Sequence, residues 1–79
     1  MYKNAYLLTL KEVYNDTEKY LFLDQKKANS YFRKAIKAAF TENEIKKDEN
    51  GNNVKQCIDA GIMKSDPYTA TIENVILID

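Results

Sequence analysis

Residues 25–40, QKKANSYFRKAIKAAF, constrain the fold of this chain more than any other stretch. Plotted at about 100° per residue, their small and aromatic side chains fall on one half of the helix, as in a stripe that faces a protein core. The stripe consists of Ala28, Tyr31, Phe32, Ala35, Ile36, Ala39 and Phe40. Asp24 precedes it and suits an N-cap, because its carboxylate can accept hydrogen bonds from the free amides of a first turn. The pattern predicts one long amphipathic helix.

Segments with the period-two pattern of β-strands lie on both sides of this helix. Residues 5–14 alternate loosely, with Tyr6, Leu8 and Leu10 on one side. A polar turn and a second apolar run follow, so residues 5–23 are predicted to form a hairpin. Residues 69–78 are rich in β-branched side chains, and a third strand is expected there. Truncating this last strand is expected to unfold the domain.

The segment between the long helix and the last strand is less regular. Residues 41–53 are rich in Asn, Asp and Glu, so we expect a variable loop with solvated carboxylates. These carboxylates belong to Glu42, Glu44, Asp48 and Glu49. Further on, Val54, Cys57, Ile58 and Ile62 stand three or four residues apart, and Gly61 could end a helix. A possible short helix is therefore expected within residues 41–62.

Together these elements predict a single α+β domain over residues 1–79, because a chain this short cannot support two cores. The expected order is ββα(α)β, with a three-stranded, mainly antiparallel sheet and one long helix on one face. The last strand is expected beside the first strand and antiparallel to it. Both faces of the strands carry apolar side chains, so the face without the long helix needs a cover. The possible short helix or another protein chain could supply it.

The residue types present exclude most kinds of catalytic chemistry. The chain has no histidine, which is the commonest general base near neutral pH and the commonest metal ligand. Cys57 is the single cysteine, and its place on an apolar helical stripe is typical of a small core residue. Gly51 and Gly61 form no phosphate-binding loop. We therefore expect no enzyme activity, no catalytic or metal-binding residues and no cofactor.

Composition bears on where the protein resides. The sequence is 44% hydrophobic and 30% charged, as in ordinary globular proteins. The longest apolar run, residues 75–78, is far shorter than the about 20 residues that cross a bilayer. The first residues lack the apolar core of a signal peptide, and a single cysteine fits a reducing compartment. A cytoplasmic protein without a membrane partner is expected.

The charges cancel in number but are unevenly placed. Twelve basic and twelve acidic residues give a net charge of zero, so an anionic partner would have to meet a local patch. Five cations of the long helix fall opposite its apolar stripe: Lys26, Lys27, Arg33, Lys34 and Lys37. They indicate either a solvated helix surface or a basic patch that meets phosphate or an acidic protein surface.

Tyrosines are abundant, with six in the chain, and Tyr6, Tyr14 and Tyr20 belong to the predicted hairpin. Tyrosine is favoured in protein interfaces because it offers a large rigid contact area with a polar tip. Packing within the core or the sheet explains the same residues. Stacking on RNA bases is a third interpretation, but the glycine- and arginine-bearing strand signature of RNA-recognition domains is absent.

Two segments carry a resemblance to a group of known proteins. YLFLDQKKANSYFRKAI over residues 20–36 and YTATIENVIL over residues 68–77 together resemble small uncharacterised proteins of bacteriophages and mobile elements. The excess of lysine over arginine also points to AT-rich coding DNA, which is common in such genomes. The resemblance implies no catalytic residue. It implies a protein that occludes the surface of a host protein, as anti-CRISPR and other anti-defence proteins do.

The sequence therefore predicts a small, non-catalytic binding protein, encoded by a phage or mobile element and cytoplasmic in the bacterial host. It would inhibit or modulate a host protein, such as a nucleic-acid-processing or defence complex, through protein–protein contact. The contact surface would be either the uncovered sheet face with its tyrosines or the basic helix. The expected contact residues are Lys26, Lys27, Arg33, Lys34, Lys37, Tyr6, Tyr14 and Tyr20. One alternative is a nucleic-acid-binding accessory protein that uses the basic helix. Another is a homodimer that pairs two uncovered sheet faces or two edge strands.

Overall fold

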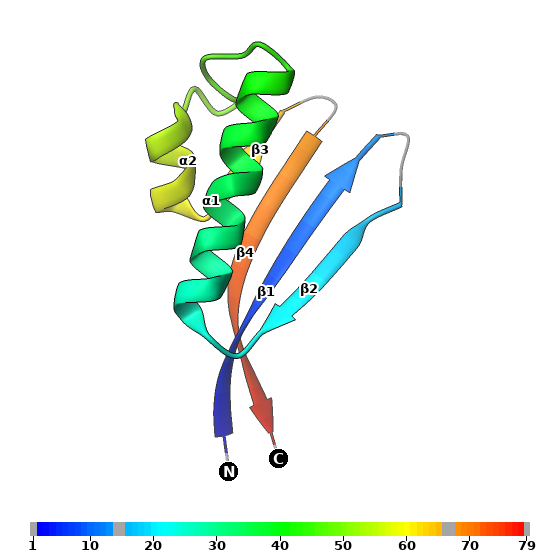
Figure 1. Cartoon of the computed structure of the whole chain (residues 1–79), viewed down its shortest axis with the longest axis vertical. Coiled ribbons are helices and arrows are strands. Elements are labelled where there is room, and N and C mark those ends of the chain that lie inside the picture. The colour runs from blue at the N-terminus through cyan, green and yellow to red at the C-terminus, as the bar shows by residue number, and fades with distance from the viewer. Residues whose placement is uncertain (1, 14–15, 66–67, 79) are drawn as a thin grey trace.

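A computed structural model describes residues 2–13, 16–65 and 68–78. Its elements in chain order are β1 (Tyr2–Glu12), β2 (Glu18–Phe22), α1 (Gln25–Glu42), α2 (Val54–Ala60), β3 (Ile62–Lys64) and β4 (Tyr68–Ile78). The strands form one antiparallel sheet in the order β2-β1-β4-β3 (Figure 1). The α+β class is confirmed, as is the last strand beside the first and antiparallel to it. The prediction of three strands is wrong, because the described residues form four.

The strand that the sequence did not reveal is β3. Three residues are too few for an alternation pattern to emerge. Gly61 ends α2 in the left-handed region, with φ 74°, and the chain enters β3 at the next residue. Met63 lies opposite Ala70 of β4 and is fully buried. The possible short helix is confirmed as α2, and it is followed at once by an edge strand.

Helix α1 begins where the sequence predicts and continues two residues further, to Glu42. The Asp24 carboxylate accepts hydrogen bonds from the backbone N–H groups of Lys26 (2.9 Å) and Lys27 (3.4 Å), which confirms the N-cap. At the other end, the Asn43 side-chain amide donates to the carbonyl of Ala39 at 2.8 Å. The buried side chains of α1 all belong to the predicted stripe: Ala28, Phe32, Ile36, Ala39 and Phe40.

Helix α2 has both of its ends fixed locally. Asn53 and Gln56 form a reciprocal capping box, in which each side chain accepts from the other residue's backbone N–H at 2.9 to 3.0 Å. At Gly61 a Cβ would lie 3.4 Å from both the side chain and the carbonyl oxygen of Ile72. Glycine therefore suits this position for its conformation and for its small size. Cys57, on the inner side of α2, is fully buried.

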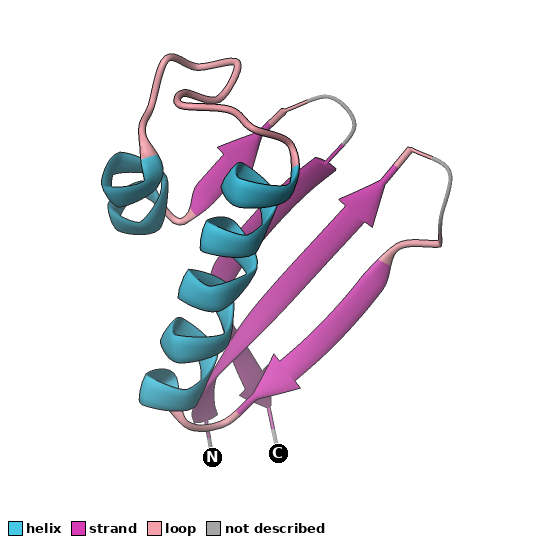
Figure 2. Ribbon diagram, turned by 45° about the horizontal axis from the view of Figure 1, so that its top comes forward, coloured by secondary structure: helices cyan, strands magenta, loops and turns pink. Residues whose placement is uncertain are grey.

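Both helices lie on the same face of the sheet (Figure 2). Their inner side chains form one core with strand residues of that side; its buried members are Leu8, Phe32, Ile36, Ala39, Phe40, Cys57, Met63 and Ala70. The shortest dimension of the protein is 18 Å, which is the thickness of one helical layer on one sheet. Helix α2 therefore does not cover the second face, and no other described segment does so. No helix in the described ranges is long and apolar enough to cross a membrane.

Strands β1 and β4 extend past α1 as a two-stranded ribbon (Figure 1). Their pairing runs from Glu12 opposite Tyr68 to Tyr2 opposite Ile78. Strand β2 pairs with β1 only as far as Tyr6, opposite Phe22. We call residues 2–5 and 75–78 the terminal ribbon. The part of β4 that holds the core is residues 68–72, and the ribbon is an extension beyond it.

Candidate functional site

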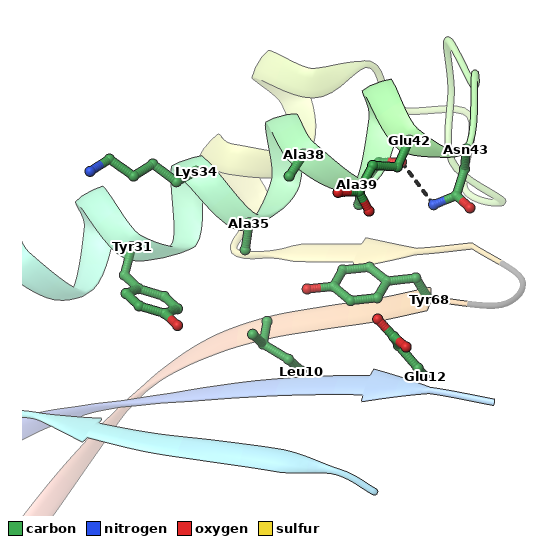
Figure 3. Close-up of a pocket in the computed structure, with 10 residues that line it drawn as sticks. All are labelled: Leu10, Glu12, Tyr31, Lys34, Ala35, Ala38, Ala39, Glu42, Asn43 and Tyr68. Atoms are coloured by element: carbon green, nitrogen blue, oxygen red, sulfur yellow. Dashed lines mark hydrogen bonds between the residues drawn. The ribbon is translucent and has the colours of Figure 1, made fainter. Parts of the chain in front are cut away.

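A hollow of about 520 Å³ opens between one flank of α1 and the sheet (Figure 3). Ala35, Ala38 and Ala39 form its helical wall, and their short side chains leave space above the sheet. Tyr31 reaches into it from α1, and Tyr68 reaches into it from β4. The remaining lining residues are Leu10, Glu12, Lys34, Glu42 and Asn43.

Carboxylates dominate the charge of this hollow and of its neighbour over the β1–β2 turn, which is lined by Leu10, Glu12, Asp16, Glu18 and Tyr68. Burial, followed by the negative charge of Glu12 and Glu18, raises the pKa of Tyr68 to about 12. Tyr20 donates a hydrogen bond to Glu18 at 2.8 Å, and this bond is the main cause that raises the pKa of Tyr20 to about 12. Both hydroxyls are therefore neutral donors at physiological pH rather than nucleophiles or bases.

The described carboxylates do not converge on a metal site: no group of three His, Cys, Asp or Glu residues is placed to hold an ion. The hollow thus offers an acidic, tyrosine-lined surface. Its carboxylates can attract cations, and the neutral Tyr68 hydroxyl can donate a hydrogen bond.

The structure places the predicted cations of α1 together on the outer side of the helix. Lys26, Lys27, Arg33, Lys34 and Lys37 are all exposed, and Lys34 also lines the rim of the hollow. No carboxylate occurs between Asp24 and Glu42 on this helix. We call these five residues the basic face.

The predicted tyrosines lie on the helix-covered side of the sheet, away from the uncovered face. Tyr6 is half-buried opposite Phe22, and Tyr20 stacks against Tyr31 with ring centroids 5.3 Å apart. Tyr14 lies outside the described residues. The expectation that tyrosines mark the uncovered face is therefore wrong for Tyr6 and Tyr20. Alternation groups them with Leu8, and the helices cover the Leu8 side.

The uncovered side of the sheet, which we call the open face, is aliphatic instead. Its apolar residues are Ala5, Leu7, Leu21, Val75, Leu77 and Ile62, with Leu23 directly after β2; Ala5 is buried among its neighbours. Leu21 is 54% exposed, Leu23 is 65% exposed and Leu77 is 37% exposed. The sequence holds the signal for this face in the alternation of β1 and β2, but it does not show which side the helices occupy.

Lysines surround the open face. The strand register places Lys3, Lys11, Lys19 and Lys64 on this side, together with the single carboxylate Glu73. All five side chains are exposed. Four positive charges against one negative charge make this rim cationic, so an acidic surface would complement it.

The loop before α2 contains a buried carboxylate with a structural role. Asp48 is 7% exposed, which corrects the prediction that the loop carboxylates are solvated. Its Oδ1 accepts from the backbone N–H groups of Asn50 and Asn52, both at 2.9 Å, and its Oδ2 accepts from the backbone N–H of Lys64 at 3.1 Å. The thiol of Cys57 donates to the same Oδ2 at 3.4 Å. Asp48 thus ties the loop to both α2 and β3.

Cys57 is a core residue, as the sequence predicts. Burial, together with the Asp48 carboxylate, raises the pKa of the Cys57 thiol to about 12. At neutral pH the sulfur is therefore a protonated donor and a poor nucleophile.

No family model matches this chain, and no curated protein or solved structure is significantly similar to it.

Proposed function

We propose that this protein is a non-catalytic binding domain that docks its open face on an acidic surface of another protein. The observation that carries the proposal is the open face itself. Leu21 is more than half exposed on a side of the sheet that no described segment covers, and Leu23, directly after β2, is also more than half exposed. A contiguous aliphatic area with a polar rim is typical of an interaction surface.

Charge and residue type define the class of partner. The rim carries Lys3, Lys11, Lys19 and Lys64, which favours a partner surface with carboxylates around an apolar centre. A nucleic acid is less well matched to this face, because single-stranded bases stack on aromatic rings and the described part of the face has none. The resemblance to phage proteins implies an inhibitor of a host protein. Such an inhibitor would bind its target through a surface like the open face.

The test is a comparison of three full-length baits in quantitative affinity capture: the wild type, Leu21→Ser/Leu23→Ser, and Lys26→Ser/Lys27→Ser. The leucine pair is exposed, so its replacement should change the free energy of unfolding by no more than about 0.5 kcal/mol per site. Covering the exposed part of each leucine is worth about 1 kcal/mol. The leucine variant should therefore bind a captured acidic protein about thirtyfold more weakly.

The captured protein is then purified and titrated against each bait by calorimetry. The lysine variant is the matched control, since its substitutions lie on α1, away from the open face. Equal affinity of the wild type and the leucine variant would contradict the proposal. Loss of affinity in the lysine variant alone would move the contact to the basic face.

A second candidate function rests on the basic face, where five exposed cations occupy one side of α1 and no carboxylate lies between Asp24 and Glu42. Such a surface can contact the phosphates of a nucleic acid. If all five cations contact phosphates of duplex DNA, the logarithm of the binding constant should fall with the logarithm of salt concentration with a slope of about −4.5. Fluorescence anisotropy from low to physiological salt measures this slope, and a flat response would eliminate the candidate.

A further inference from the structure

The terminal ribbon exposes apolar side chains on both of its faces. Tyr2, Ile76 and Ile78 belong to the ribbon and lie on the helix side of the sheet by register, and they are 73%, 63% and 79% exposed. Leu77 lies on the opposite side and is 37% exposed. A two-stranded ribbon alone is marginally stable in water, so a third strand and a cover for these side chains would stabilise it.

Two edges of this ribbon have no pairing strand among the described residues, residues 2–5 of β1 beyond β2 and residues 73–78 of β4 beyond β3, and the β4 edge is the longer. Strand β3 pairs with β4 only over residues 69–71, and the last contact on that side is the Ile72 N–H bonded to the carbonyl of Gly61 at 2.9 Å. Backbone groups of alternate strand residues point to opposite sides. Asn74, Ile76 and Ile78 therefore direct their N–H and C=O groups to the side where no described segment pairs with β4.

The two outer strands of the sheet, β3 and β2, are protected from edge pairing in ways that the β4 edge is not. At β3, the Lys64 N–H donates to Asp48 and the Lys64 carbonyl accepts from the N–H of Glu49 at 2.7 Å, so the loop covers that edge. Strand β2 has only five residues and carries Glu18 and Lys19. Short strands with charged residues resist edge pairing. Residues 73–78 contain one charged residue, Glu73, and no proline.

The geometry points to a second copy of this chain as the partner of the free edge, with β4 pairing antiparallel to β4 of the second copy about a two-fold axis at Ile76. This register pairs Ile76 with its own copy, Asn74 with Ile78, and Val75 with Leu77. All three residues with free backbone groups then gain partners. Aliphatic side chains meet across the strands on both faces, and such cross-strand pairs stabilise sheets.

Self-pairing fits this edge because an antiparallel strand pair with a two-fold axis is isologous: each residue meets its reciprocal partner. The register also keeps the helices of both copies on one side, and it leaves both open faces uncovered. Pairing of two copies through their open faces is disfavoured, because it would bring two cationic rims together, each with Lys3, Lys11, Lys19 and Lys64.

The size of the contact sets the expected strength. Specific protein–protein interfaces bury about 600–1,000 Å² per partner, and a five-residue strand pair with the ribbon side chains is a small contact on this scale. A dissociation constant in the micromolar range is expected, so the dimer should dominate at about 100 µM and dissociate on dilution. This inference goes beyond the proposed function, because it uses a different surface and requires no other protein.

The first experiment measures mass by sedimentation equilibrium for the full chain, whose monomer is 9.2 kDa. Ile76→Asp places two carboxylates opposite each other across the axis and should weaken dimerisation about a hundredfold or more. Leu23→Asp is the control, because Leu23 is 65% exposed and Ile76 is 63% exposed, yet Leu23 lies outside the ribbon. A monomeric wild type at about 100 µM, or a dimer lost in Leu23→Asp and kept in Ile76→Asp, would overturn the inference.

The second experiment tests the register with cysteine pairs. Val75 and Leu77 of the second copy would face each other at a non-hydrogen-bonded position, where Cβ atoms are about 4.5–5.5 Å apart and a disulfide can form with small adjustment. A mixture of Val75→Cys and Leu77→Cys chains should give a mixed disulfide under mild oxidation. Each variant alone should link much less, because its own copy is offset by two residues. Cys57 is buried and does not compete.

The result that supports the register is strong enrichment of the mixed species over both self-linked species on non-reducing mass analysis. Equal linking in all three samples would overturn it, as would no linking in any. Circular dichroism of Ile76→Asp shows whether that variant folds. A folded monomer supports the edge contact, and an unfolded Ile76→Asp leaves the decision to the cysteine pairs.

Discussion

Replacing Phe32 by alanine is expected to destabilise this protein by about 3–5 kcal/mol. Phe32 is 1% exposed, lies in the middle of α1 and is the largest fully buried side chain among the described residues. Removing its ring leaves a cavity between α1, α2 and the sheet that the surrounding side chains cannot fully close. A domain of this size has a total stability of about 4–12 kcal/mol, so the loss approaches the whole of it.

Urea denaturation followed by circular dichroism measures this loss, and the neighbouring aromatic residue supplies the control. Tyr31 is 41% exposed, and its ring centroid lies 5.3 Å from that of Tyr20 and 5.8 Å from that of Phe22. Tyr31→Ala removes a ring of similar size from the edge of the core, so about 1–2 kcal/mol should be lost. Equal losses for the two variants would mean that the core is not centred where the structure places it.

Replacing Asp48 by asparagine is expected to cost about 3 kcal/mol. The groups that face this carboxylate all donate: the N–H groups of Asn50, Asn52 and Lys64, and the thiol of Cys57. Asparagine can present only one oxygen, so its amide N–H₂ would face donors and at least one pair of bonds would be lost. In thermal unfolding this corresponds to a drop in Tm of about 12–24 °C for a domain of this size.

Asp59→Asn is the matched control, since Asp59 is an exposed residue of α2. Its substitution should change stability by no more than about 0.5 kcal/mol. If Asp48→Asn were as stable as Asp59→Asn, the carboxylate would not tie the loop to β3.

The same carboxylate makes stability depend on pH in a defined direction. Burial alone would raise the pKa of Asp48, but its hydrogen bonds outweigh burial and hold that pKa below the ordinary value of 3.8. When a carboxyl group has a lower pKa in the folded state than in the unfolded state, its ionised form stabilises the fold at pH values above the unfolded pKa. This stabilisation is lost as the pH falls through the folded pKa. The stability difference between the wild type and Asp48→Asn should therefore be full at pH 7 and shrink below about pH 4.

The sequence predicted the helices well because their signals are local. Asp24 and the apolar stripe define α1, and Gly61 defines the end of α2, each within one or two turns of chain. Strand β3 is different, since its three residues show no strand pattern of their own. They form a strand because they pair with β4, where Met63 lies opposite Ala70. The burial of Asp48 was missed for the same reason, because one of its donors, Lys64, lies sixteen positions along the chain.

The candidate site could be predicted only in part. The five cations of α1 lie opposite the buried stripe in any amphipathic helix, and their exposure follows directly from the pattern. Alternation divides Leu7 and Leu21 from Tyr6 and Tyr20, but it does not say which set the helices cover. That choice depends on how the whole chain packs, so the aliphatic open face emerged from the structure.

The pairing of β1 with β4 also determines the order in which this protein can fold. Tyr2 lies opposite Ile78 and Glu12 lies opposite Tyr68, so the central strand pair joins segments that are remote along the chain. Closing so long a loop costs entropy before any contact repays it, and sheets of this kind fold slowly compared with helical domains. During synthesis, β1 leaves the ribosome long before its partner strand exists. Until β4 arrives, the nascent chain can form α1 and the β1–β2 hairpin but cannot complete its core.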